Sequence, residues 1–103
     1  MKVKVNNLAE AKKIIKKEKA SLAKNYGVSK IGIFGSFAFD DFSPKSDIDI
    51  LIDQSHKSKM SYFDLINIEN KLAKMLGRKV DLVTKTSLKP YIKNDILKSV
   101  MYV

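Results

Sequence analysis

The sequence predicts an α+β fold, with its elements in α/β order, in which helices pack on one small mixed β-sheet. Along the chain, short apolar segments typical of strands alternate with longer segments whose apolar residues repeat at helical spacing. The connection between the first two strands is too short for a crossover helix, which favours an antiparallel pair or a mixed sheet. The 103 residues, 45% of them hydrophobic, suffice for one domain. We therefore expect a single domain over residues 1–103, with an N-terminal helix over 1–27 and a core over 28–103.

The first helix is expected to begin after Asn6 or Asn7, either of which can cap its N-terminus, and to end at Gly27. Its apolar residues share one face: Leu8, Ala11, Ile15 and Leu22. Lysines take the outer face, at positions 12, 13, 16 and 17. This lysine face is either simply solvated or a contact for an acidic partner.

Two strands follow the first helix. Residues 30–34 form a short apolar strand that runs directly into Gly35-Ser36, and residues 36–41 are expected to form a helical turn. Residues 47–53 read DIDILID, an alternation typical of a strand with one buried face. The three isoleucines point to one side of this strand, and the other side carries Asp47, Asp49, Leu51 and Asp53.

A second helix is expected over 61–76, after a polar loop over 54–60. Ser61 and Asp64 resemble a capping box at its start, and Gly77 closes its end. The residues expected on its core side are Tyr62, Leu65, Ile66, Leu72 and Leu76.

The last part of the chain adds a third strand over 79–84, which places Asp81 between two apolar residues. Pro90 suits the first turn of a final helix, in which Ile92, Ile96 and Val100 are expected to face the core. Residues 101–103 are expected to add a short edge strand or to dock a partner.

Composition narrows the classes of function. The chain has no cysteine, which excludes disulfides and thiolate metal sites. No segment has the apolar length of a signal peptide or a membrane span, so we expect a cytoplasmic protein without a membrane partner. The net charge of +9 favours polyanions such as nucleic acid, nucleotides or an acidic protein surface, although a solvated lysine-rich exterior explains it equally well.

Acidic residues are concentrated in one segment of this basic chain. Five of the eleven acids lie within residues 40–53, and Lys45 is the only base among them. Asp47 and Asp49 are two residues apart in one strand, so their carboxylates share a face with Cα atoms about 7 Å apart. Two negative charges so close repel each other unless a cation binds, which indicates a divalent metal site. Solvated aspartates on a half-exposed strand are the alternative.

Asp81 joins this site if its strand neighbours the strand of Asp47 and Asp49; otherwise it is a surface residue on an edge strand. A set of carboxylate oxygens without a histidine or cysteine cluster favours Mg²⁺ or Mn²⁺ over zinc. Two metal ions held by the three carboxylates would activate an attacking hydroxyl and neutralise a triphosphate in an in-line displacement.

Gly35-Ser36 stands between an apolar strand and a helical turn. Glycine lets the backbone approach a ligand closely, and the free N–H groups at a helix start attract phosphate. The hydroxyl of Ser36 adds a donor. The pair therefore suits the phosphates of a nucleoside triphosphate, and an ordinary tight turn with a serine cap is the alternative.

Together these motifs resemble the signature of the polymerase-β-like nucleotidyltransferase superfamily, most of all its minimal prokaryotic members, the MNT-domain proteins. Gly35-Ser36-Phe37-Ala38 is followed by residues 46–51, which read SDIDIL and are similar to the S-D-I-D-L form of that family. Residues 79–83, KVDLV, resemble the strand that carries its third carboxylate. The resemblance covers roughly residues 28–103 and implies the nucleotidyltransferase fold, with 28–103 as the catalytic core.

The resemblance implies a Mg²⁺-dependent transfer of AMP from ATP to a hydroxyl group. Asp47, Asp49 and Asp81 would bind two Mg²⁺ ions, or Mn²⁺, with Asp81 also suited to act as general base. Gly35 and Ser36 would bind the phosphates of ATP or another nucleoside triphosphate. Many small proteins of this kind are antitoxins that neutralise HEPN-domain toxins by transferring AMP to a tyrosine. The implied partner is therefore a HEPN-domain protein from the adjacent gene.

The chain departs from the family at one point. The family often reads G-S-x-A-R-G, whereas this chain has Phe39-Asp40 in place of the arginine and second glycine. Because arginine suits phosphate binding, its loss keeps a second hypothesis open, a binding module that neutralises a HEPN partner by complex formation without turnover. A basic nucleic-acid-binding domain is the third hypothesis, although the sequence lacks the interleaved aromatic and basic residues of single-strand binders.

Four other residues are weaker candidates for a functional role. His56 stands alone in a polar loop and is expected to be solvated rather than catalytic. Tyr62, Phe63 and Tyr91 lie at helical spacings and are expected to belong to the core or to an interface.

Overall fold

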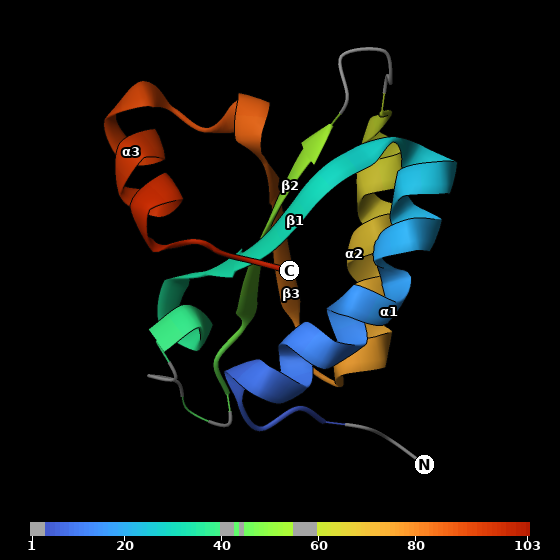
Figure 1. Cartoon of the computed structure of the whole chain (residues 1–103), viewed down its shortest axis with the longest axis vertical. Helices are drawn as coiled ribbons and strands as arrows, with labels where there is room; N and C mark the ends of the chain where they lie inside the picture. The colour runs from blue at the N-terminus through green and yellow to red at the C-terminus, as the bar shows by residue number, and fades with distance from the viewer. Residues whose placement is uncertain (1–3, 40–42, 44, 55–59) are drawn as a thin grey trace.

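The structure is a computed structural model that describes residues 4–39, 43, 45–54 and 60–103. Within these residues, three α-helices flank one four-stranded sheet with the strand order β3-β2-β1-β4 (Figure 1). β1 (Val28–Phe34) and β2 (Ile48–Gln54) pair antiparallel, and β3 (Val80–Thr84) runs parallel to β2. β4 (Met101–Tyr102) pairs antiparallel with β1 and forms one edge of the sheet. The predicted α+β fold with a mixed sheet is confirmed.

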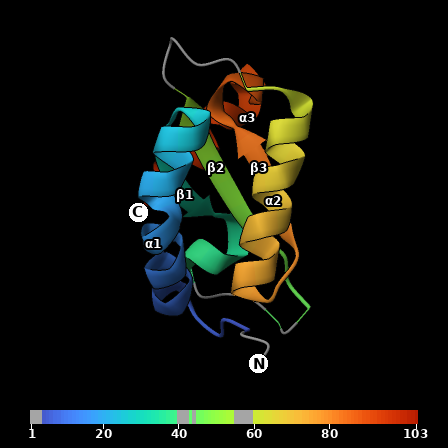
Figure 2. The same ribbon diagram turned by 90° about the vertical axis from the view of Figure 1, so that its right-hand side faces the viewer.

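Two helices cover one face of the sheet and the third lies against the other face. α1 (Leu8–Tyr26) and α2 (Tyr62–Leu76) run side by side on the first face, and α3 (Pro90–Ser99) lies on the opposite side (Figures 1 and 2). The core fills the space between the sheet and the first two helices. Its fully buried aliphatic side chains are Ile15, Leu22, Ile31, Ile33, Ile48, Ile50, Ile52, Ile68, Leu72 and Leu76. The three isoleucines of β2 therefore point inward, as their alternation predicts.

α1 begins and ends where the sequence indicates. The side chain of Asn7 accepts a hydrogen bond of 2.8 Å from the backbone N–H of Glu10, which makes Asn7 the N-cap. Gly27 adopts φ 71° and donates its backbone N–H to the last turn. Such a left-handed cap is easiest for glycine, because glycine has no Cβ.

α2 carries the predicted capping box, but its exposed face was assigned wrongly. Ser61 and Asp64 exchange hydrogen bonds of 3.0 and 3.1 Å at its start. Tyr62 is 74% exposed and Ile66 lies at the surface, so neither faces the core as predicted. The buried stripe is set by Ile68, and Ile66 stands two residues from it, about 200° around the helix. Phe63 is also exposed, so its predicted place in a core is wrong, whereas a role in an interface stays a prediction.

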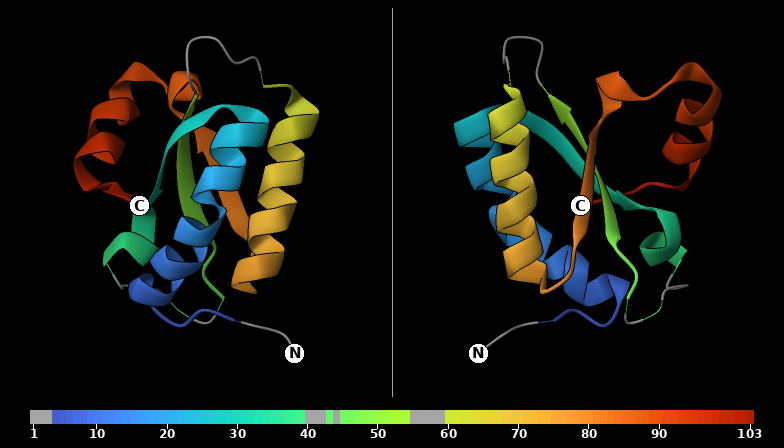
Figure 3. Two further views of the ribbon diagram at one scale, coloured as in Figure 1. Left: turned by 45° about the vertical axis from the view of Figure 1, so that its right-hand side comes forward. Right: turned by 180° about the vertical axis from the view of Figure 1, so that it is seen from behind.

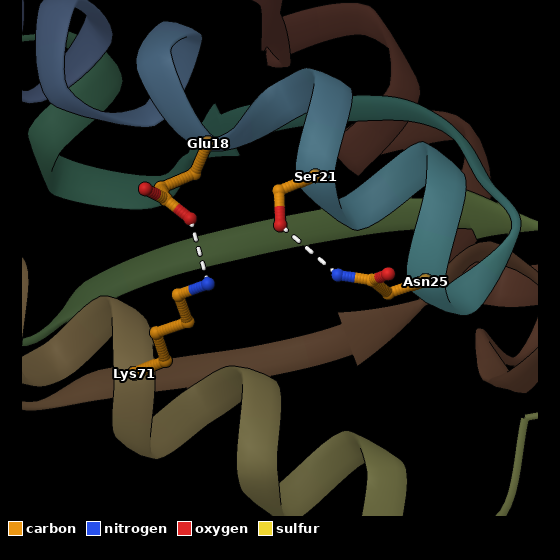
Figure 4. A network of polar contacts seen from close by, with 4 residues as sticks. All are labelled: Glu18, Ser21, Asn25 and Lys71. Carbon is orange, nitrogen blue, oxygen red and sulfur yellow. Dashed lines mark hydrogen bonds and ion pairs between the residues drawn. The ribbon is translucent and has the colours of Figure 1, made fainter.

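α1 and α2 are joined by an ion pair on their outer side (Figure 4). Lys71 Nζ lies 2.8 Å from Glu18 Oε2, and this hydrogen bond raises the pKa of Lys71. One turn further along α1, Asn25 donates to the hydroxyl of Ser21 at 3.2 Å. Because the side chain of Lys71 is 45% exposed, this pair adds little to the stability of the protein.

α3 begins at Pro90, as predicted, but it does not insert into the core. None of its residues is fully buried: Ile92 is 38% exposed, Ile96 is half-buried, and Tyr91 stands at the surface. The expected core positions of Ile92, Ile96 and Val100 are therefore wrong, because α3 lies on the opposite side of the sheet from the core that α1 and α2 cover. The predicted edge strand after α3 is confirmed as β4, and the backbone N–H of Val103 donates to Ile31 at 2.9 Å. No helix in the described residues is long and apolar enough to cross a membrane.

Candidate active site

The turn after β1 lies directly against the acidic strand. β1 runs into a 3-10 turn, η1 (Gly35–Phe39), which packs beside the first residues of β2 (Figure 3, right). Gly35 adopts φ 71°, and a Cβ built on it would overlap the Oδ2 atom of Asp49. Both the backbone conformation and the close approach therefore require glycine at this position. The structure thus brings Gly35 and the carboxylate of Asp49 together.

The turn is anchored by its own apolar residues. Phe37 is fully buried and Ala38 nearly so, whereas Ser36 is half-buried and Phe39 is 68% exposed. The helical turn predicted over 36–41 is present as far as Phe39, and Asp40 lies outside the described residues. His56 also lies outside them. The buried side chain of Phe37 anchors the turn in the protein interior, so that Gly35 is held beside Asp49.

Asp49 and Asp81 are direct neighbours across two strands. β2 and β3 pair in parallel register with Asp49 opposite Asp81, and Phe34 of β1 is the partner of Asp49 on its other side. Strands in a sheet lie about 4.8 Å apart, and side chains in register point to the same face. Both carboxylates therefore project from the face opposite to the buried isoleucines. Asp47 immediately precedes β2 and is exposed.

The three carboxylates influence one another electrostatically. Burial, reinforced by the negative charges of Asp81 and then Asp47, raises the pKa of Asp49 from 3.8 to about 6. Within the part of the chain that the structure describes, none of the three forms an ion pair. Asp53, by contrast, pairs with Lys85 at 3.8 Å. The charges of Asp47, Asp49 and Asp81 thus act on one another without an ion-pair partner among the described residues, whereas Asp53 is paired with Lys85.

This donor set fits a hard divalent cation. Carboxylate oxygens are the ligands that Mg²⁺ and Mn²⁺ prefer, and a bound cation would relieve the repulsion that raises the pKa of Asp49. As the side chains stand, no three Asp, Glu, His or Cys residues of the described ranges form a group that could hold a metal ion. Asp47 and Asp81 are exposed, so their side chains are free to change rotamer when a cation binds.

Arg78 braces the site and was not singled out from the sequence. Its side chain is 7% exposed, and its Nε donates to the carbonyl of Val5 at 2.8 Å. Its Nη1 donates to the carbonyls of Ser43 and Ser46 at 3.2 and 3.3 Å, just before Asp47. The guanidinium also stacks 5.1 Å from the ring centre of Phe37.

One signal in the sequence points to this residue. Arg78 is the single arginine among 20 basic residues, the others all being lysine. A chain that uses lysine everywhere else keeps arginine where a planar fork of donors is needed. One guanidinium here contacts the segment that leads into Asp47 and the turn that carries Gly35 and Ser36.

The sequence matches the family described as "Nucleotidyltransferase domain" over residues 9–103. The chain belongs to this family. It is 43% identical over 100 residues to "Putative protein adenylyltransferase MJ1217" of Methanocaldococcus jannaschii, covering 96% of this chain and 100% of that protein. It is 38% identical over 96 residues to "Protein adenylyltransferase MntA" of Thermococcus cleftensis, covering 93% of this chain and 95% of that protein.

Solved structures share the fold of this nucleotidyltransferase. A structure described as "putative minimal nucleotidyltransferase" superposes with a TM-score of 0.71 at 23% identity, covering 92% of this chain and 94% of that one. A chain of the complex between tri-AMPylated Shewanella oneidensis HEPN toxin and MNT antitoxin has a TM-score of 0.65 at 22% identity, covering 89% and 70%. The predicted membership among minimal nucleotidyltransferases of the protein adenylyltransferase type is confirmed.

Proposed function

We propose that this minimal nucleotidyltransferase transfers AMP from ATP to a tyrosine of a HEPN-type toxin encoded by the adjacent gene, and so acts as its antitoxin. One observation carries the proposal: Asp49 and Asp81 stand in register on adjacent parallel strands, with the backbone of Gly35 against the Asp49 carboxylate. A glycine turn that binds phosphate beside paired carboxylates is the arrangement that phosphoryl-type transfer requires. Relatives described as protein adenylyltransferases support the choice of AMP as the transferred group.

Each residue of the site has a stated role in the proposal. Asp47, Asp49 and Asp81 would hold Mg²⁺, as two ions, or Mn²⁺, which neutralises the charge of the triphosphate and favours ionisation of the attacking hydroxyl. The backbone N–H groups of the turn at Gly35 and the hydroxyl of Ser36 bind the β- and γ-phosphates. Arg78 keeps the turn and the segment before Asp47 in place without touching the nucleotide, because its side chain is buried.

The proposed reaction is an in-line displacement at the α-phosphorus. The tyrosine oxygen forms the new bond to phosphorus, the bond to the bridging oxygen of the β-phosphate breaks, and pyrophosphate leaves with that electron pair. The carboxylate of Asp81 accepts the phenol proton. Asp81 suits this role because it is the more exposed member of the Asp49–Asp81 pair.

All residues of the proposed site lie in residues 28–103, with α1 packed on the back of the sheet. We therefore propose residues 1–103 as one catalytic unit whose acceptor hydroxyl comes from another protein. The structures of toxin–antitoxin complexes with the same fold support a HEPN-type partner, and one of them is described as containing AMP-PNP.

The test is transfer of label to the purified HEPN protein. ATP labelled at the α-phosphate should label that protein in the presence of Mg²⁺, whereas ATP labelled at the γ-phosphate should not. Asp47→Asn should abolish labelling, and Asp53→Asn is the matched control because Asp53 pairs with Lys85. Mass spectrometry should place AMP on a tyrosine. Labelling that survives Asp47→Asn would contradict the assignment of the site.

A binding module without turnover is the second candidate, and one observation favours it. Phe39, which replaces the arginine usual in the family, is largely exposed beside the turn and offers an apolar contact rather than a charge for phosphate. In that case the HEPN protein would form a stable complex and be neutralised equally well by the wild type and by Asp47→Asn, with no AMP incorporated.

A further inference from the structure

A second charged surface lies at the other edge of the sheet. A groove of about 500 Å³ runs between α1 and β4 and is lined by Ala9, Lys12, Lys13, Lys16, Tyr102 and Val103. An adjoining hollow of about 280 Å³ shares the last two residues and adds Lys19, Lys30 and Ile31. We refer to the two hollows and their five lysines as the basic groove. The groove is lined by α1, β1 and β4, whereas Asp49 and Asp81 lie on β2 and β3 (Figure 1).

Within the described residues, no ion pair involves a lysine of the basic groove. Among the described residues no acid lines either hollow, and the two ion pairs of the structure involve other lysines. Lys19 Nζ donates to the carbonyl of Val103 at 2.8 Å, and Lys30 Nζ lies 5.7 Å from the ring centre of Tyr102. Five positive charges are thus gathered around two hollows that no described Asp or Glu lines, and a bound polyanion would lower their mutual repulsion.

The fold also supplies the aromatic group that the sequence pattern lacks. Tyr102 comes from β4, Lys30 from β1 and the other four lysines from α1, so residues far apart in the chain meet at one edge. Tyr102 lies opposite Gly32, where a Cβ would stand 3.2 Å from its ring, so glycine leaves room for the ring. The side chain of Tyr102 remains 44% exposed. Single-strand binders combine two features. Their basic side chains lie along the nucleic-acid backbone, and an aromatic ring stacks on a base.

We propose that the basic groove binds single-stranded nucleic acid, with the lysines contacting phosphates and Tyr102 stacking on a base. Nucleic acid fits better than an acidic protein surface because the ring of Tyr102 stands exposed beside the lysines, where a base can stack on it. The site extends beyond the proposed transfer of AMP and does not depend on it.

The test is binding of fluorescent oligonucleotides of about twelve nucleotides, within the range of known single-strand sites, followed by anisotropy. Oligo-U and oligo-dT should bind with similar affinity, because neither phosphate contact nor stacking reads the sugar. With five phosphate contacts, the slope of log K against log salt should be about −3.5, from about −0.7 per contact. Affinity should therefore fall about 100-fold between 50 and 200 mM salt.

Two variants with the same change of net charge distinguish binding at the basic groove from binding that depends on net charge alone. Lys12→Ala/Lys13→Ala/Lys16→Ala removes three lysines of the groove, and Lys24→Ala/Lys74→Ala/Lys89→Ala removes three exposed lysines elsewhere. The groove variant should bind at least 30-fold more weakly at low salt, with its slope reduced to about −1.4 for two remaining contacts. The control variant should lose less than threefold. Equal losses in both variants would overturn the proposal, because binding would then follow net charge alone.

Tyr102 provides the second readout. Tyr102→Ala should weaken binding about tenfold with an unchanged salt slope, and Tyr102→Phe should bind like the wild type, since stacking needs only the ring. Thermal unfolding of each variant checks that the edge strand is intact.

Tighter binding of duplex than of single strands would overturn the stacking role. Loss of HEPN binding in the groove variant with unchanged oligonucleotide binding would show a protein surface instead. Asp47→Asn should bind oligonucleotides normally, so failure of the proposed transfer reaction would leave this result unaffected.

Discussion

The uncompensated charge of Asp49 should cost the protein stability, and this cost can be measured. The folded protein raises the pKa of Asp49 from 3.8 to about 6, through burial first and then the charges of Asp81 and Asp47. Each pKa unit corresponds to about 1.36 kcal/mol, so the full rise corresponds to about 3 kcal/mol. Because the carboxylate is partly exposed and water screens it, we expect about 1–2 kcal/mol.

The direction of the pH dependence follows from the raised pKa. Between about pH 4 and 6 the folded protein binds more protons at Asp49 than the unfolded chain does, so its contribution to stability falls as the pH rises through this window. Above about pH 6 the whole cost is present. Asp49→Asn keeps the shape of the side chain and removes the charge. At pH 7.5 in EDTA it should raise the free energy of unfolding by about 1–2 kcal/mol, which corresponds to a melting temperature about 5–10 °C higher for a domain of this size.

Urea unfolding followed by circular dichroism at pH 7.5 and pH 5 tests this reasoning. The difference between Asp49→Asn and the wild type should fall to about half at pH 5, where the folded wild type is largely protonated at this position. Mg²⁺ should stabilise the wild type and leave the variant nearly unchanged. Asp53→Asn, which removes a carboxylate paired with Lys85, should give no such gain. The reasoning is refuted if Asp49→Asn destabilises the protein at pH 7.5 or if its effect does not change with pH.

Three further substitutions test the turn, its brace and a helix cap. Arg78→Lys keeps the charge but loses the forked hydrogen bonds to Ser46 and its neighbours, and should lower the free energy of unfolding in urea by about 1–3 kcal/mol; an unchanged midpoint would contradict a bracing role. Gly35→Ala should abolish AMP transfer, because its Cβ would overlap the carboxylate of Asp49 and the left-handed φ disfavours alanine; full labelling activity would argue against this geometry. Asn7→Ala should cost about 1 kcal/mol in the same urea assay through loss of the α1 cap, without affecting labelling.

The features predicted correctly from sequence are those fixed by neighbours along the chain. The strand alternation of residues 47–53 places Ile50 in the core and Asp49 on the opposite face, because successive side chains of a strand alternate. The caps at Asn7 and Gly27 depend on hydrogen bonds within one helical turn, so the local sequence specifies them. The register of Asp49 with Asp81 was only conditional, because it depends on β3 lying beside β2.

The errors concern packing between elements. An apolar helical stripe fixes which residues share a side, but not how much of that side the sheet covers, and this is why Tyr62 and Ile92 stand at the surface. The role of Arg78 joins three segments separated by more than thirty residues, which no local pattern reveals. The basic groove likewise combines Lys30 and Tyr102 with lysines of α1, so its aromatic group could not be assigned from sequence spacing.

The net charge of +9 conceals a division of charge across the sheet. The acids of the candidate active site lie on β2 and β3 or directly before β2, and the lysines of the basic groove lie beside β4 at the other edge of the sheet. The mutual repulsion of Asp47, Asp49 and Asp81 costs stability that a neutral strand would keep, and the buried Arg78 holds the backbone directly before Asp47. Stability alone does not explain why three repelling carboxylates stand together beside a buried arginine. The binding of a cation and a nucleotide does explain it. The groove is lined by α1, β1 and β4, and the acids lie on β2 and β3 or directly before β2, so the two charged surfaces share no residue and the proposed ligands need not compete.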